Sequence, residues 1–509
     1  MLFNSFTFIF LFFPITAFGY FILARKSHAF AAAWLALASL VFYGWWSLSY
    51  IPLLLGSIIF NYWMGQRINA AHNTSRKSWL TVAVAADLAL LGYYKYSDFF
   101  ISGINQLAST DFPALNIILP IGISFFTFTQ IAYLVDTYHR KVNESNPIHY
   151  LLFITYFPHL IAGPVLHHAE MMPQFARKSS YQFSSRNLAV GVSFFAIGLA
   201  KKVVIADNLA PHAAFLFDQS DMFSLLVAWG GVLAYAFQLY FDFSGYSDMA
   251  IGISLVFGIR LPLNFNSPYK SANIIEFWRC WHMTLSRFLR DYLYVPLGGN
   301  RKGPVRRYVN LMLTMVLGGL WHGAGLNFVI WGGLHGFYLI VNHAWNRIAL
   351  ELRFPQGSRV WTVFSVALTF ASVCFAWVFF RATDSAKAVT IVQGMLGEFG
   401  IALPASIGLY LKPLKPILDQ LGIDFYLGGG SRFIETWSWI VVAGVIAFFL
   451  PNTQQIMGRY EVWAESKKTS KTELLLWQPS LRWSVWIGVI LLGSMLSLTR
   501  PTEFLYFQF

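Results

Sequence analysis

The stretch that decides the fold is residues 225–259, LLVAWGGVLAYAFQLYFDFSGYSDMAIGISLVFGI. Its only strongly polar long-chain or charged residues are Gln238, Asp242 and Asp248. A helix needs about 20 predominantly apolar residues to cross a bilayer. We therefore expect this stretch to lie in a membrane, with the Ser244-Gly245 pair interrupting the helix near its middle.

Similar apolar runs recur along the whole chain. Of its 509 residues, 56% are hydrophobic and only 12% are charged, whereas a soluble globular chain has roughly 25% charged residues. The pattern predicts an all-α, polytopic integral membrane protein with roughly 10 to 13 transmembrane or re-entrant helices. We expect residues 1–509 to form a single membrane domain.

The charges predict an orientation, because cytoplasmic loops of membrane proteins are enriched in Lys and Arg. Arg25 and Lys26 follow the first apolar run, residues 47–50 carry no charge, and Arg67 lies after the third run. This alternation places the N-terminus outside the cytoplasm. The same rule accounts for the net charge of +13. No nucleic-acid motif accompanies that charge, so a nucleic-acid partner is not expected.

Residues 260–307 differ from the apolar runs on either side, since they hold nine basic residues and two acidic ones. Apolar side chains recur at three- and four-residue steps, as on one helical face; they are Ile274, Trp278, Trp281, Leu285, Phe288 and Tyr292. A polar stripe recurs at the same steps and comprises Arg279, His282, Ser286 and Arg290. The pattern predicts an amphipathic helix at the cytoplasmic interface, whose stripe could also face a substrate path.

His322 lies in the sequence GGLWHGA at 318–324, between apolar flanks. An ionisable group at membrane depth is costly, so it is a functional candidate by default. Neighbouring glycines let backbone or ligand approach closely, and the imidazole group suits proton transfer near neutral pH. A core histidine satisfied by a neighbouring hydroxyl or carbonyl is the alternative interpretation.

Three further polar residues, Gln238, Asp242 and His335, also lie in apolar surroundings. Gln238 and Asp242 are four residues apart and share a helical face. A buried carboxylate needs partners, so we expect a polar network that could border the active site. His335 is expected to line a pocket or to have a structural role. No zinc-binding motif, nucleophile elbow or phosphate-binding loop is present, so a metal site, serine hydrolysis and ATP-driven work are not predicted.

Longer blocks of sequence carry a family resemblance. They are YFDFSGYSDMA at 240–250, LNFNSPY at 263–269, EFWRCWHMTLS at 276–286, DYLY at 291–294, LGGNRKG at 297–303 and WHGA at 321–324. Together they resemble the membrane-bound O-acyltransferase (MBOAT) superfamily, in particular its polysaccharide-acetylating branch with the alginate O-acetyltransferase membrane subunit. The resemblance covers nearly the whole chain.

This resemblance implies a many-helix membrane fold with a funnel and a central histidine. His322 matches the essential histidine of the superfamily, and His282 matches its second recurring polar position. The resemblance also implies an acetyl donor in the cytoplasm, expected to be acetyl-CoA, and no tightly bound cofactor. Acetyl groups would be delivered outward across the bacterial inner membrane. Periplasmic acetyltransferase partner proteins would then modify an exopolysaccharide such as alginate.

In the expected mechanism His322 takes the proton of the acceptor hydroxyl, and His282 or Asp242 orients a substrate. Arginine suits phosphate recognition, so part of the polar stripe is expected to dock the donor: Arg279, Ser286 and Arg290. Two functions of other classes stay open at this point. One is an acyl or glycan-related transporter or flippase, and the other is a membrane scaffold for a polysaccharide-secretion complex.

Overall fold

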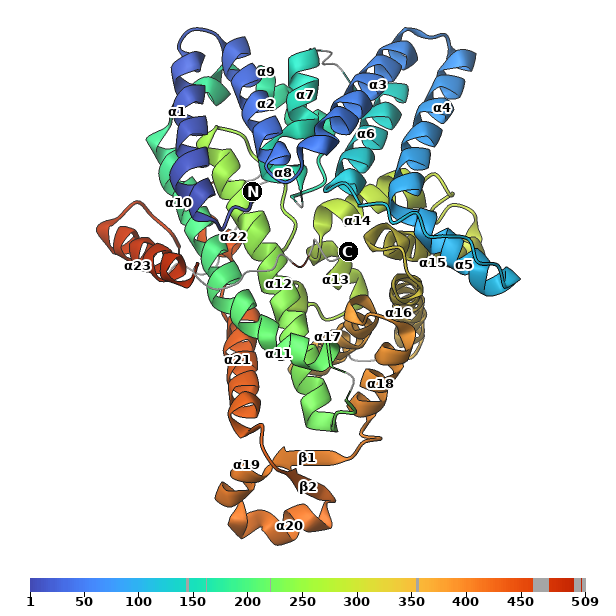
Figure 1. Cartoon of the computed structure of the whole chain (residues 1–509), viewed down its shortest axis with the longest axis vertical. Helices are drawn as coiled ribbons and strands as arrows, with labels where there is room; N and C mark the ends of the chain where they lie inside the picture. Colours follow the sequence, from blue (N-terminus) through green and yellow to red (C-terminus); the bar gives the residue numbers. More distant parts are fainter. Residues whose placement is uncertain are drawn as a thin grey trace.

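The computed structural model describes residues 1–142, 146–161, 163–219, 221–353, 357–460, 476–498 and 505. Within these ranges most of the chain is helical, as predicted (Figure 1). The helices are α1 (Phe13–Ala24), α2 (His28–Gly44), α3 (Ile51–Ala70), α4 (Asn73–Leu91), α5 (Ser97–Ala108), α6 (Ile123–Tyr138), α7 (Pro147–Thr155), α8 (Phe157–Leu160), α9 (His168–Ala176), α10 (Ser185–Ala200), α11 (Asp207–Phe217), α12 (Leu225–Val256), α13 (Ile274–Cys280), α14 (Met283–Leu289), α15 (Gly303–His322), α16 (Leu326–Glu351), α17 (Arg359–Arg381), α18 (Ser385–Leu396), α19 (Ala405–Tyr410), α20 (Lys415–Gln420), α21 (Gly430–Phe449), α22 (Thr453–Ile456) and α23 (Leu481–Ser497). Strands β1 (Ile401–Pro404) and β2 (Ile423–Tyr426) form one short parallel pair.

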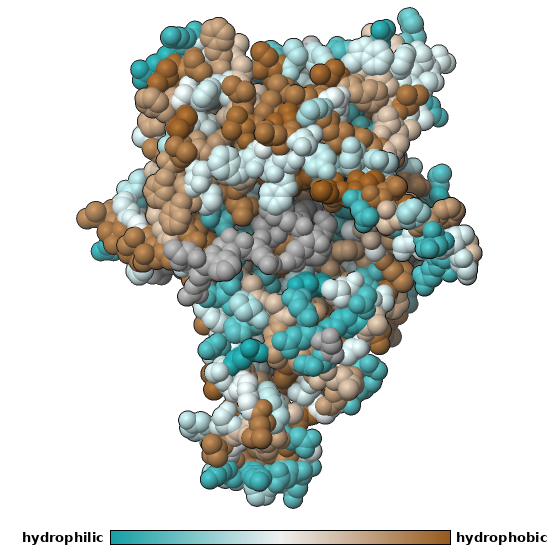
Figure 2. All heavy atoms as spheres, in the orientation of Figure 1, coloured by the Kyte–Doolittle hydropathy of each residue, from teal (hydrophilic) through white to brown (hydrophobic). Residues whose placement is uncertain are grey.

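Many helices present apolar side chains outward, as a protein surrounded by lipid must. Figure 2 shows hydrophobic side chains gathered over the upper part of the molecule, where α1 to α4 lie. Among the described residues, five helical segments are long and apolar enough to cross a membrane; they are Leu48–Ala70, Ser185–Phe217, Leu225–Val256, Arg359–Arg381 and Gly430–Phe449. Three shorter apolar helices accompany them. The predicted total of 10 to 13 spans stays a prediction.

Helix α12 runs unbroken through the middle of the molecule (Figure 1). The predicted interruption at Ser244-Gly245 is therefore wrong. Gly245 serves instead as a contact point, because a Cβ there would lie 2.7 Å from the carbonyl oxygen of Gly198 in α10. Gly252 meets the carbonyl of Gly191 in the same way, at 2.4 Å. Small residues let membrane helices approach this closely.

Glycines also join α15 to α16, next to His322. A Cβ on Gly319 would lie 2.1 Å from the carbonyl oxygen of Phe328, and one on Gly332 would lie 2.3 Å from that of Met315. The backbones of the two helices are thus in direct contact. Gly319, three residues before His322, and Gly332 therefore allow α16 to pack closely against α15.

The basic segment departs from its prediction as a single amphipathic helix. It forms α13 and α14, followed by a π-helical turn at Arg290–Tyr294. The break falls at His282, which has a φ of +40°. The loop that contains Asn264 and Asn266 satisfies the opened backbone: Met283 N–H donates to the carbonyl of Asn264, and Asn266 N–H donates to that of Cys280, both at 2.9 Å. This local pairing divides the predicted polar stripe.

Candidate active site

His322 is the last residue of α15 and is 8% exposed. Its ring lies among aromatic rings, with centroid distances of 4.9 Å to Trp321, 5.2 Å to Trp331 and 5.1 Å to Phe380. Trp331 belongs to α16 and Phe380 to α17. Three helices therefore enclose the imidazole and restrict its rotation.

His282 lies beside His322, with their ring centroids 6.4 Å apart. It is 1% exposed, and its ring packs against Phe243 of α12 at 4.8 Å. Neither ring nitrogen of His282 has a hydrogen-bond partner within the described ranges. The left-handed turn at this residue separates it from Arg279 and directs it into the core. The structure thus brings the two predicted catalytic histidines together. His322 lines the first of the two cavities described next, and His282 lines neither.

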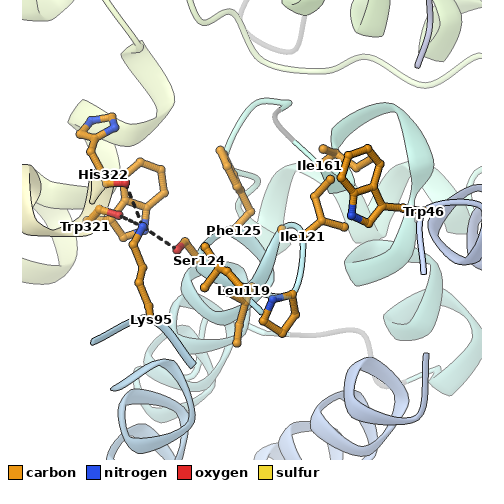
Figure 3. Close-up of a pocket in the computed structure, with 12 residues that line it drawn as sticks. Trp46, Lys95, Leu119, Ile121, Ser124, Phe125, Ile161, Trp321 and His322 are labelled. Carbon is orange, nitrogen blue, oxygen red and sulfur yellow. Dashed lines mark hydrogen bonds between the residues drawn. The ribbon is translucent and has the colours of Figure 1, made fainter. Parts of the chain in front are cut away.

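A first cavity, of about 120 Å³, is bordered by His322. It also contains Lys95, which was not identified from the sequence. The Lys95 Nζ donates to the carbonyl oxygens of Trp321 at 2.6 Å and His322 at 2.9 Å, and to the hydroxyl of Ser124 at 3.4 Å (Figure 3). Trp46 lies across the cavity. The only sequence signal for Lys95 is its position as a single cation near the end of an apolar run.

A second cavity, of about 760 Å³, follows the basic segment and the earlier turns of α15. The residues predicted to dock the donor all line it; they are Arg279, Ser286 and Arg290. Three more basic residues not assigned from the sequence line it too, namely Arg287, Arg307 and His343. No acidic residue is among the described residues that line this cavity. It also includes Met283 and Thr284, which directly follow His282.

His335 lies in α16 and is fully buried. Its Nδ1 accepts a hydrogen bond from the indole N–H of Trp278, at 3.3 Å. Trp331 contacts both histidines, with ring centroids 4.8 Å from His335 and 5.2 Å from His322. His335 therefore supports the aromatic wall around His322 without lining either cavity.

Asp242 forms an ion pair with Lys202, with 2.8 Å between Oδ1 and Nζ. The same ammonium group is 2.7 Å from Asp207, and the backbone N–H of Leu505 donates to Asp242 at 3.3 Å. Gln238 is buried one turn earlier on α12. Neither Gln238 nor Asp242 lines the two cavities. The geometry places Asp242 in a structural network that joins α12 to its neighbours.

The fold and the site together define an integral membrane enzyme, built from helices around a buried pair of histidines. The chain belongs to the membrane-bound O-acyltransferase (MBOAT) family, whose model matches residues 46–383. That range includes both histidines and Lys95. The resemblance, the membrane fold and the acyltransferase class are thereby confirmed.

Named relatives extend over most of the chain. It is 47% identical over 485 residues to the peptidoglycan O-acetyltransferase of Helicobacter pylori, covering 90% of each chain. It is 42% identical over 407 residues to the probable alginate O-acetylase AlgI of Pseudomonas aeruginosa, covering 79% of this chain and 75% of the relative. A more distant relative, the teichoic acid D-alanyltransferase of Bacillus subtilis, is 28% identical over 282 residues, covering 53% and 70% respectively.

Proposed function

We propose that the protein takes acetyl groups from acetyl-CoA in the cytoplasm and delivers them across the bacterial inner membrane for O-acetylation of a polysaccharide. The observation that carries this proposal is the arrangement of the two cavities along α15. A large basic cavity follows its earlier turns, and a small cavity lies at its last turn, where His322 is located. In this proposal the donor docks in the basic cavity, and the acceptor enters the small cavity at His322.

The basic cavity suits a phosphate-bearing thioester such as acetyl-CoA. Arginine binds phosphate through several N–H donors at once. Arg287 is held by Glu170 and Arg290 by Asp291. No ion pair in the described part of the chain engages Arg279, so we assign the strongest donor contact to that residue. The exposed Arg290 pair is weak, since such pairs contribute about 0–1 kcal/mol, and a phosphate could displace Asp291.

In the proposed reaction His322 acts as general base. It accepts the proton of the acceptor hydroxyl as that oxygen attacks the thioester carbonyl. The carbon–sulfur bond then breaks, and the imidazolium returns the proton to the departing thiolate. General base catalysis contributes roughly 10²–10⁴-fold. The surrounding aromatic rings exclude water, which limits hydrolysis of the thioester. His282, whose ring nitrogens are unpaired in the described structure, would orient the acetyl group or the acceptor.

The names of the relatives suggest two polysaccharides as the final acceptor. The higher identity and coverage of the peptidoglycan O-acetyltransferase favour peptidoglycan, and alginate or a similar exopolysaccharide is the second candidate. In both cases periplasmic partner proteins would complete the transfer. The loop charges favour a periplasmic N-terminus.

A cellular experiment tests this proposal and names the acceptor. A deletion strain would be complemented with the wild-type gene or with His322→Gln, and base-released acetate would be measured in purified peptidoglycan and in exopolysaccharide. We expect acetate to fall in one polymer in the deletion strain and to return only with the wild type. Unchanged acetate in both polymers would contradict the proposal. Reconstituted protein and labelled acetyl-CoA would then test the donor directly.

A further inference from the structure

The helix that carries His322 ends inside the protein, and its last carbonyl groups need hydrogen-bond partners. An α-helix leaves the carbonyl oxygens of its final four residues without partners inside the helix. In α15 these belong to Gly319, Leu320, Trp321 and His322. Gly323 N–H donates to Gly319, but at a long 3.4 Å. The other three carbonyls depend on groups from elsewhere in the chain.

Two adjacent residues more than 220 positions earlier provide those groups. The hydroxyl of Tyr96 donates to the carbonyl of Leu320 at 2.6 Å. The ammonium of Lys95 donates to Trp321 at 2.6 Å and to His322 at 2.9 Å. All four terminal carbonyls of α15 are therefore bonded, three of them by this one pair of side chains.

The local backbone explains how neighbouring side chains can act together. Lys95 and Tyr96 end the π-helical turn Gly92–Tyr96, which links α4 to α5. Tyr96 has a φ of −115° and a ψ of −6°, outside regular helix geometry. In a regular helix consecutive side chains diverge around the axis. The π-turn and the change of direction at Tyr96 direct both side chains to the end of α15. Such π-turns are frequent at functional sites.

The charge of Lys95 also fits this position. In the described ranges no carboxylate forms an ion pair with Lys95; its partners are two carbonyls and the Ser124 hydroxyl. A cation is favourable at the C-terminal end of a helix, where the carbonyl dipoles point outward. The carbonyl oxygens at the helix end therefore take the place of the carboxylate that a cation in an apolar region normally needs as a partner.

We propose that Lys95 and Tyr96 form a clamp on the last turn of α15, and that Lys95 is a positioning residue which holds His322 in register for proton transfer. The inference rests on the proposed role of His322 as general base. Lys95 forms no bond with the substrate in this proposal, and it acts through the backbone of the residue that does. A displacement of about 1 Å at a catalytic group can lower the rate on the order of 100-fold.

The test uses membranes of a strain that expresses the full-length protein together with its periplasmic partner proteins. Acetyl-CoA is the donor, and the acceptor is the one that the wild type acetylates, either muropeptides or de-O-acetylated alginate oligosaccharides. Lys95→Met keeps the length of the side chain but removes its donors, and Lys95→Arg keeps the charge and donors. Lys77→Met is the matched control, because Lys77 lies exposed on α4. We expect Lys95→Met to lower kcat by about 10- to 100-fold with the KM for donor and acceptor nearly unchanged. Lys95→Arg should recover part of kcat, and Lys77→Met should match the wild type.

Several outcomes would overturn the positioning role. A normal kcat in Lys95→Met would do so, and a raised acceptor KM at normal kcat would make Lys95 a substrate-binding residue. Failure of Lys95→Arg to recover any activity would also count against it. If Lys95→Met does not accumulate in membranes, Tyr96→Phe removes a single clamp hydroxyl, and an unchanged kcat in that variant would overturn the clamp. His322→Ala in the same assay separates the two proposals. If His322→Ala is active, His322 is not the general base and the proposed function fails. If His322→Ala is inactive and Lys95→Met has a normal kcat, only the clamp proposal fails.

Discussion

Replacing His322 by glutamine or alanine gives the most direct test of the proposed chemistry. Glutamine retains a hydrogen-bonding group of similar reach and most of the side-chain volume, but it cannot accept the proton. Alanine removes both the proton acceptor and the volume. If His322 is the general base, both variants should lose activity to a similar extent, because the lost function is the same.

The structure sets the expected magnitudes. Loss of a general base lowers the rate by roughly 10²–10⁴-fold, or about 2.7–5.4 kcal/mol of transition-state stabilisation at 1.36 kcal/mol per tenfold change. The imidazole packs within 5.2 Å, between ring centroids, of Trp321, Trp331 and Phe380. Alanine would leave a void there, and large-to-small changes in packed sites cost about 2–5 kcal/mol of stability. Glutamine should cost much less stability, which makes it the sharper variant.

The assay measures acetate released by base from the purified polysaccharide, together with the membrane level and melting temperature of each variant. Both variants should give acetate near that of the deletion strain, with His322→Gln present at close to the wild-type level. Substantial acetylation by a well-expressed His322→Gln would show that hydrogen bonding suffices, and His322 would then have a structural role. Near-normal acetylation by His322→Ala would remove the residue from the mechanism altogether.

Three further predictions follow from the cavities, the loop charges and the buried ion pairs. Arg279→Ala should raise the KM for acetyl-CoA at least tenfold, since a hydrogen bond to a charged group contributes about 1.5–3 kcal/mol, and it should leave the acceptor KM unchanged. Arg290→Ala should raise the KM for acetyl-CoA less, because the guanidinium of Arg290 is already paired with Asp291. Single cysteines placed in residues 301–306 should react with an impermeant maleimide only after the cells are permeabilised, and labelling of intact cells would reverse the orientation. Lys202→Met should lower the melting temperature and the membrane abundance of the protein, because unpairing a buried charge costs about 3–5 kcal/mol. Adding Asp242→Asn should restore part of both. A double variant as unstable as the single one would contradict the structural network around Lys202 and Asp242.

Much of the fold follows from the sequence because a membrane imposes a simple rule. Long apolar stretches without charge can only be helices there, so the all-α polytopic class was predictable from hydropathy. The predicted break in α12 was wrong because the effect of a glycine on a helix differs between water and a packed membrane domain. Glycine lowers helix stability in water, but in a packed membrane domain Gly245 lets α10 approach, and neighbouring helices surround that segment.

In the candidate site, the sequence identifies residues with a local signal and misses those whose positions depend on contacts far apart in the chain. His322 was a candidate because one histidine in an apolar stretch is a local signal. The predicted helix across His282 was wrong because backbone groups of Asn264 and Asn266 pair with the broken turn, and helical spacing carries no record of that pairing. Lys95 could not be assigned, since its partners are backbone carbonyls 226 and 227 residues away. A backbone partner leaves no residue-type signature for a sequence to show.

The histidine pair lies where helices end, and this placement has a physical reason. Non-helical backbone at membrane depth is tolerated only when it is buried in protein or lines a cavity. His282 is at the left-handed break before α14, and His322 is at the end of α15. Each break exposes backbone polar groups that must be satisfied: the Asn264 and Asn266 backbone serves the first, and Lys95 with Tyr96 serves the second. A continuous helix would have held its side chains against neighbouring helices. At the end of α15 a cavity borders His322, and at both breaks the groups that satisfy the backbone also determine where the two imidazoles lie.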